Sequence, residues 1–270
     1  MKNMKLYVLI ILSALLVYSC GNSDSNKGNK ANDVTVVTAD NGTVQQKYPM
    51  PTSFQVTETI NKAGAAYISG ITNQIENIEK YFTAKSRALN LGVYGADLAY
   101  VSTYQKKQET MNYLEASKKL IDQLEITTAF NEGLVEKVEK NLENKDTLIQ
   151  IISKSYYDTY EFLTQNGRDN LSLLVIAGSW IEGLYITSQV ALSTKSNQEI
   201  VQIIINQKAT LNDLIELLNP SSSDPSIADV LTDLNNLKVM FDQLDNPSQN
   251  EIFNNVIKKL EIIRNKIIQS

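Results

Sequence analysis

Histidine is absent from the 270-residue chain. This absence excludes the commonest acid–base side chain at neutral pH, serine or cysteine nucleophiles activated by histidine, and every metal site with histidine ligands. A glycine-rich phosphate loop and a dinucleotide-binding fingerprint are missing as well. The sequence therefore predicts no catalytic residue, no cofactor and no bound metal from a known motif.

Proline is scarce, and none of the five prolines lies between Thr52 and Asn219. Proline removes a backbone donor and interrupts helices, so its absence over this span favours long helices. Hydrophobic residues make up 43% of the chain and charged residues 20%, which is typical of a packed globular protein. We therefore expect an all-α fold.

Cysteine occurs once, as Cys20, at the end of a short N-terminal apolar run. Lys2 and Lys5 lie in the first five residues, and the twelve-residue apolar run 6–17 follows them. A helix needs about 20 residues to span a bilayer, so this run is typical of an export signal and not of a membrane span. A protein with one cysteine cannot form an internal disulfide, and its stability must come from packing.

Residues 17–20 (Val-Tyr-Ser-Cys) resemble the lipobox of bacterial lipoproteins. This resemblance implies that residues 1–19 are a signal peptide and that Cys20 carries a lipid after cleavage. Two alternatives remain open, namely a secreted protein with a free thiol and an uncleaved signal anchor. The expected location is a bacterial membrane reached by export, with the outer membrane favoured and the face left open.

Residues 20–51 are rich in Asn, Ser, Lys, Gly, Asp and Thr, and we interpret them as the lipidated cysteine followed by a flexible linker. Loss of Lys2 and Lys5 would leave 23 basic and 30 acidic residues, a net charge of −7. No run of Lys or Arg occurs, so nucleic acid is not expected as a partner. The membrane is the expected partner, through the lipid on Cys20.

Apolar residues recur every three or four positions over 52–270, which predicts a bundle of eight or nine antiparallel helices. A capping box at 52–55 precedes the first apolar stripe, which is formed by Ile68, Ile71, Ile75, Ile78 and Phe82. The further expected helices span 87–106, 108–124, 131–142, 146–163, 170–192, 197–218, 226–244 and 249–268. The segment 170–192 is apolar nearly all round and is expected to be the central helix.

Composition changes near residue 195, because no glycine, tyrosine or tryptophan follows it. Residues 52–270 are expected to form one domain, with a division into 52–195 and 196–270 as the alternative.

Small residues gather in two of the expected helices. Gly92, Gly95, Ala96 and Ala99 share one face of the first, and 177–183 offers a matching face on the central helix. Each glycine costs about 1 kcal/mol in a helix relative to alanine, so something should compensate. Close helix packing is the favoured interpretation, and a ligand groove is the alternative.

Asp97 and Glu182 interrupt these apolar helices, where an unpaired charge would be costly. Arg87 and Arg168, two of only three arginines, lie near the ends of the same helices and are the expected partners. On this hypothesis Asp97→Asn should destabilise the protein by about 1–3 kcal/mol if the pair is structural. A neutral or stabilising effect would instead indicate that the acids hold a ligand.

Aromatic side chains near the two acids could line a pocket for a cationic or sugar-like ligand. The candidates are Tyr94, Tyr100, Tyr104, Trp180 and Tyr185. The favoured alternative is a satisfied buried polar network. A two-carboxylate hydrolase is a third possibility, although nothing in the sequence determines the separation of the two acids.

Two stretches, 88–100 (ALNLGVYGADLAY) and 177–185 (AGSWIEGLY), together with the lipobox, resemble exported all-helical lipoproteins of Bacteroidetes. The resemblance implies a fold and a location, and it implies no catalytic residue. The leading hypothesis is a lipid-anchored helical binding or scaffolding protein of the cell envelope. A small-ligand-binding protein with its site at Asp97 and Glu182 is the alternative.

Overall fold

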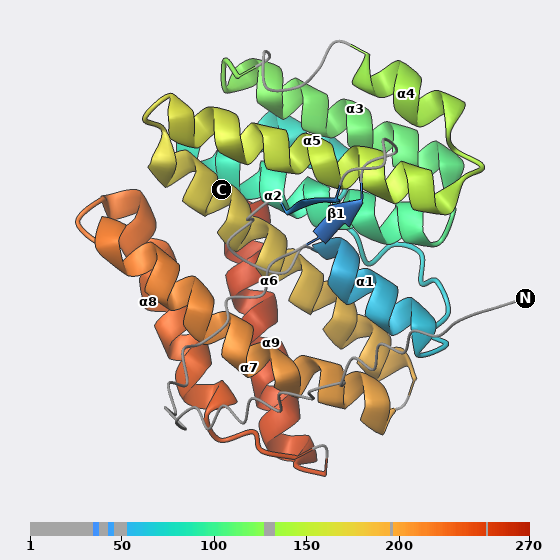
Figure 1. Ribbon diagram of the computed structural model, residues 1–270. Helices are drawn as coiled ribbons and strands as arrows, with labels where there is room; N and C mark the ends of the chain where they lie inside the picture. The colour runs from blue at the N-terminus through green and yellow to red at the C-terminus, as the bar shows by residue number, and fades with distance from the viewer. Residues whose placement is uncertain (1–34, 38–42, 46–52, 127–132, 195–196, 247) are drawn as a thin grey trace, which may run out of the picture. The chain divides into compact units, whose positions relative to one another are not determined.

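Long helices form nearly all of the chain that the computed structural model describes (Figure 1). It describes residues 35–37, 43–45, 53–126, 133–194, 197–246 and 248–270. These residues belong to one unit, Ala31–Ser270. The expected all-α bundle is confirmed, whereas Cys20 and the signal segment lie outside the described residues.

The helices α1 to α9 follow one another along the described part of the chain, with two short 3-10 helices, η1 and η3. Their bounds are α1 Ser53–Lys62, η1 Ile75–Lys80, α2 Ala84–Thr103, α3 Lys107–Gln123, α4 Leu134–Lys140, α5 Lys145–Gln165, α6 Asp169–Ser193, α7 Gln198–Leu218, η3 Asn219–Ser221, α8 Pro225–Phe241 and α9 Asn250–Ile268.

A short hairpin precedes the helices, within the segment expected to be a linker. Strand β1 (Thr35–Val37) pairs antiparallel with β2 (Thr43–Gln45), and Val36 lies opposite Val44. Each strand has only three residues, so the hairpin does not alter the all-α class.

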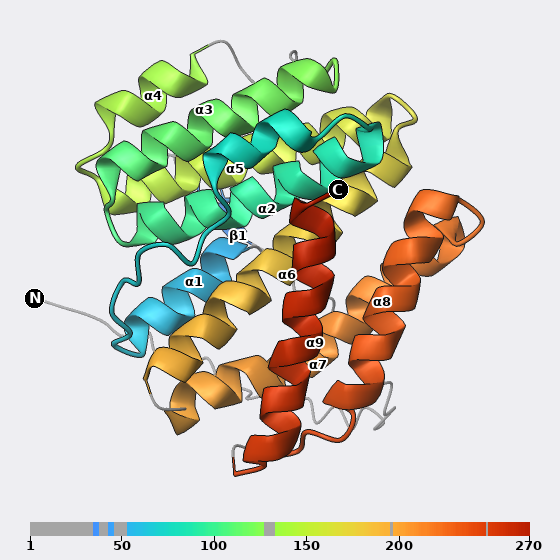
Figure 2. The same ribbon diagram turned by 180° about the vertical axis from the view of Figure 1, so that it is seen from behind.

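Helices α2 and α6 pack against each other at the centre of the described bundle (Figure 2). Gly92 of α2 faces the Val175 carbonyl of α6, and Gly178 of α6 faces the Leu89 carbonyl of α2. A Cβ atom at either glycine would overlap that backbone carbonyl. The expected close packing is therefore confirmed at Gly92 and Gly178, where backbone contact compensates the poor helix propensity of glycine. Gly95 instead faces the Tyr156 ring of α5, and Gly183 lies nearest to Ser53 of α1.

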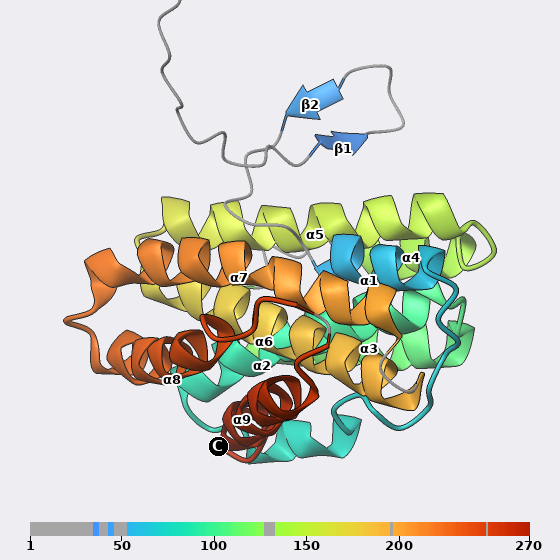
Figure 3. The ribbon, with the colours of Figure 1, turned by 90° about the horizontal axis from the view of Figure 1, so that it is seen from below.

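The other helices surround this central pair. Helix α3 contacts α2 and helix α7 contacts α6, whereas α1, α5 and α9 contact both central helices. Figure 3 shows α6 between α7 and α9. Helices from both sides of residue 195 contribute to one hydrophobic cluster of buried side chains.

Helix α6 is long and apolar enough to cross a membrane by composition, and it is the one such helix among the described residues. However, 83% of the most apolar stretch of α6 is buried inside the protein. Its position in the bundle matches the expected central helix.

Local signals correctly located most helix ends. Asp224 caps α8 by accepting a hydrogen bond from the Ser226 backbone N–H at 2.7 Å, and Pro225 follows in the first turn. Gly167, just after α5, has a φ of +66° as a helix C-terminal glycine should. Asn131 and Pro247, expected near the starts of α4 and α9, lie outside the described residues.

The prediction of an amphipathic helix from Ile68 to Phe82 is wrong. Helix α1 ends at Lys62, and a largely irregular segment, residues 63–83, follows with only the 3-10 helix η1 inside it. Gly64 and Gly70 each have a φ of +79°, which a right-handed helix cannot contain. Phe82, expected on the buried stripe, is 77% exposed.

Candidate functional site

The two acids singled out in the sequence meet in the protein interior. Asp97 lies on α2 and Glu182 on α6, and neither side chain is exposed to solvent. The Glu182 carboxylate lies close enough to Asp97 to raise the pKa of Asp97. The predicted burial is confirmed, and the close approach of α2 and α6 explains why the acids meet.

Arg264 of α9 supplies the positive charge at this site. Its Nε and Nη2 donate to the two carboxylate oxygens of Glu182 at 2.9 and 2.8 Å, a bidentate ion pair. The guanidinium carbon lies 4.4 Å from the centre of the Tyr185 ring, which is a cation–π contact. Burial acts to lower the pKa of Arg264, but the charge and hydrogen bond of Glu182 outweigh it and raise the pKa, so this arginine stays protonated.

The expected pairing of the acids with Arg87 and Arg168 is wrong. Arg87 donates to the backbone carbonyls of Tyr81 and Gln123, and Arg168 donates to the carbonyl of Leu124. The carbonyls of Gln123 and Leu124 lie at the C-terminal end of α3, where helix carbonyls lack intrahelical partners. Arg87 and Arg168 therefore hold loop ends and take no part in the acid site.

Asp97 carries an unusual protonation state. Burial and the neighbouring Glu182 carboxylate raise the pKa of Asp97 well above its ordinary value, although Arg264 opposes the shift. Oδ2 of Asp97 accepts from the backbone N–H of Asn73 at 3.2 Å, while Oδ1 has no donor among the described residues. Protonation of Asp97 would relieve the repulsion between two buried acids beside one cation.

Asn73 connects this acid site to the irregular segment 63–83, and sequence reasoning missed it. Besides its N–H bond to Asp97, it donates through Nδ2 to the Tyr81 hydroxyl at 2.9 Å and accepts from Asn77 through Oδ1 at 2.7 Å. Its carbonyl accepts from the Tyr113 hydroxyl at 2.9 Å. Every polar group of this buried residue is therefore used, which holds the segment over Asp97.

The tyrosines expected to line a pocket instead hold segment 63–83 in place. The Tyr94 hydroxyl donates to the carbonyl of Gln74 at 3.0 Å, and the Tyr104 hydroxyl donates to that of Ala65 at 2.8 Å. Tyr100 accepts from the Ile68 N–H at 2.7 Å, and burial raises its pKa to about 12. These hydroxyl groups replace the backbone hydrogen bonds that a helix would have made.

The two other aromatic candidates behave differently from each other. Tyr185 contacts Arg264, as described above, and so belongs to the acid site. Trp180 is 7% exposed, and its indole N–H has no hydrogen-bond partner among the described residues. Trp180 is part of the hydrophobic core.

The acid site offers little to a ligand or substrate. Asp97 and Glu182 are covered completely, Oδ2 of Asp97 accepts from Asn73, and both carboxylate oxygens of Glu182 accept from Arg264. Among the described residues, no group of three or more His, Cys, Asp and Glu side chains could hold a metal ion. The geometry supports a buried polar network.

Asp97→Asn tests this protonation state. Asparagine can accept from the Asn73 N–H and donate to Glu182, so it mimics protonated Asp97 without the cost of ionisation. A carboxyl group with a raised pKa contributes stability that is present below its unfolded value and lost as pH rises through its folded value. We expect urea unfolding to show that the variant is at least as stable as wild type at pH 7 and more stable at pH 9.

A surface aspartate supplies the matched control for this substitution. Asp158 pairs with Lys154 one turn away on α5, and Asp158→Asn should change the free energy of unfolding by less than about 1 kcal/mol at either pH. If Asp97→Asn destabilises the protein at every pH, the proton assigned to Asp97 is wrong.

No protein-family model, no curated protein and no solved structure matches this chain.

Proposed function

We propose that the chain is an exported lipoprotein, anchored to a bacterial membrane through a lipid on Cys20, whose helical domain serves as a binding or scaffolding module. The observation that carries the proposal is the single cysteine, placed directly after a twelve-residue apolar run in a lipobox-like sequence. The resemblance to exported helical lipoproteins of Bacteroidetes supports the same location. Several acyl chains would give stable attachment, because each buried methylene contributes about 0.8 kcal/mol.

The geometry of the acid site favours a non-catalytic role over the hydrolase considered above. Two-carboxylate hydrolases hold their acids at least about 5 Å apart, with room for substrate or water between them. Asp97 and Glu182 are both fully buried, which leaves no access for a substrate or an attacking water. The same burial argues against a ligand site at these two acids.

Fatty-acid labelling tests the anchor. Cells fed a clickable fatty acid should label the wild-type protein and leave Cys20→Ala unlabelled, because the chain has no second thiol. The labelled protein should sediment with membranes. Ser25→Ala, a substitution in the linker, should be labelled like wild type and serves as the control. Equal labelling of wild type and Cys20→Ala would overturn the proposal.

A further inference from the structure

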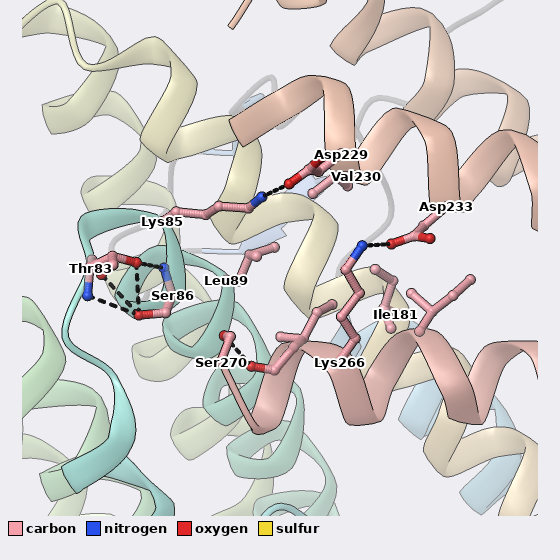
Figure 4. Close-up of a pocket in the computed structure, with 12 residues that line it drawn as sticks. Thr83, Lys85, Ser86, Leu89, Ile181, Asp229, Val230, Asp233, Lys266 and Ser270 are labelled. Atoms are coloured by element: carbon pink, nitrogen blue, oxygen red, sulfur yellow. Dashed lines mark hydrogen bonds and ion pairs between the residues drawn. The ribbon is translucent and has the colours of Figure 1, made fainter. Parts of the chain in front are cut away.

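A small pocket opens away from the acid site, where the start of α2 meets α6, α8 and α9 (Figure 4). Its volume is about 150 Å³. Five aliphatic side chains from these four helices line it: Leu89, Ile181, Val230, Ile263 and Ile267. An aliphatic cavity of roughly this size holds a benzene-sized molecule. The pocket thus accommodates one small apolar group.

Two ion pairs lie beside this apolar lining. Lys85 of α2 reaches Asp229 of α8 at 2.7 Å, and Lys266 of α9 reaches Asp233 of α8 at 2.7 Å. Asp229 and Asp233 are one helical turn apart, so both pairs attach to the same face of α8, as Figure 4 shows. The Lys85 and Asp233 side chains are the more sheltered members, 29% and 20% exposed.

The ion pairs favour the charged forms of Asp229 and Lys266. Lys85 lowers the pKa of Asp229, and the hydrogen bond to Asp233 raises the pKa of Lys266. The pocket therefore offers two cations and two anions with no net charge. A ligand with a single charge would leave one of these groups without a partner, whereas a zwitterion can exchange partners with both signs.

We propose that this pocket binds a free apolar α-amino acid, with the side chain against the aliphatic lining. Its carboxylate would contact Lys85 or Lys266, and its ammonium would contact Asp229 or Asp233. A phenylalanine or leucine side chain is close to the benzene-sized group that the cavity holds. This inference rests on the proposed binding role of the helical domain and is independent of the lipid anchor.

Calorimetry on the purified protein in detergent tests the ligand class with L-phenylalanine and L-leucine as probes. We expect saturable binding of both. N-acetyl-phenylalanine lacks the ammonium and phenylalanine amide lacks the carboxylate, and each should bind at least about tenfold more weakly, because a charged hydrogen bond is lost. Toluene fills the cavity without either charge. Toluene binding as tight as that of phenylalanine, or no saturable binding of either amino acid, would overturn the proposal.

Two substitutions locate the binding on the protein. Asp233→Asn and Lys85→Gln should each weaken phenylalanine binding about tenfold, while Lys154→Gln, which breaks an ion pair on α5, should leave it unchanged. Circular dichroism checks the fold of each variant, and the ligand series on wild type remains decisive if a variant does not fold. If all three variants bind phenylalanine equally tightly, the assignment of phenylalanine binding to this pocket is wrong.

This test is separate from the test of the anchor. Acylated protein that binds no amino acid overturns the ligand assignment alone. Amino acid binding by a protein that is not acylated overturns the anchor alone.

Discussion

Arg264→Met is expected to lower the free energy of unfolding by about 3–5 kcal/mol, because it removes the cation that makes a bidentate ion pair with the buried Glu182 carboxylate. Methionine keeps the apolar length of the side chain but leaves the Glu182 carboxylate uncompensated at zero exposure. The variant also loses the contact of the guanidinium with the Tyr185 ring. Urea unfolding, followed by circular dichroism, measures the change.

Two controls separate the charge effect from the packing effect in this experiment. Arg264→Met combined with Glu182→Leu removes both charges and should recover most of the lost stability, because apolar side chains can replace a buried ion pair. Lys154→Met breaks an exposed pair on α5 and should cost less than about 1 kcal/mol. If Arg264→Met alone is as stable as wild type, the buried pair does not hold α6 to α9.

Gly178→Ala is expected to destabilise the protein by about 3 kcal/mol, against the usual preference for alanine in helices. The added Cβ would overlap the Leu89 carbonyl of α2, which is backbone and cannot rotate away. Helices α2 and α6 would have to separate, which loosens the centre of the core. Thermal and urea unfolding measure the effect, and Gly92→Ala should behave in the same way because the contact is reciprocal.

Gly183→Ala is the matched control on the same helix. Its nearest neighbour would be Cβ of Ser53 at 3.8 Å, an ordinary contact. Alanine should therefore leave stability unchanged or raise it by up to about 1 kcal/mol, through helix propensity alone. If Gly178→Ala also proves neutral, the backbone contact between α2 and α6 is not close enough to require glycine.

Part of the acid site could be predicted from sequence. Asp97 and Glu182 were recognisable because a charge inside an apolar helix needs a partner. The error concerned which arginine supplies it, because Arg87 and Arg168 were chosen for lying on or beside the same helices. Arg264 lies four residues after Leu260 and three before Ile267, on the buried stripe of α9, and that spacing was an available signal.

The wrong partner also reversed the expected effect of Asp97→Asn. Paired with an arginine, Asp97 would be charged, and asparagine would destabilise. Beside Glu182 the pKa of Asp97 is raised, which favours the protonated form, and asparagine should replace that form without loss. A stabilising effect of this variant therefore no longer indicates a ligand, because proximity of like charges explains it.

The sequence by itself determined the all-α class and most helix bounds, because proline, caps and three-four spacing act within a few residues. Only the tertiary structure decided that segment 63–83 is not a helix. Its apolar spacing satisfies a helix locally, but tyrosine hydroxyls from α2 and α3 bind its backbone instead. The same holds for Arg264 and the two acids, since α9 reaches α6 across 82 residues of chain, a distance that no local pattern encodes.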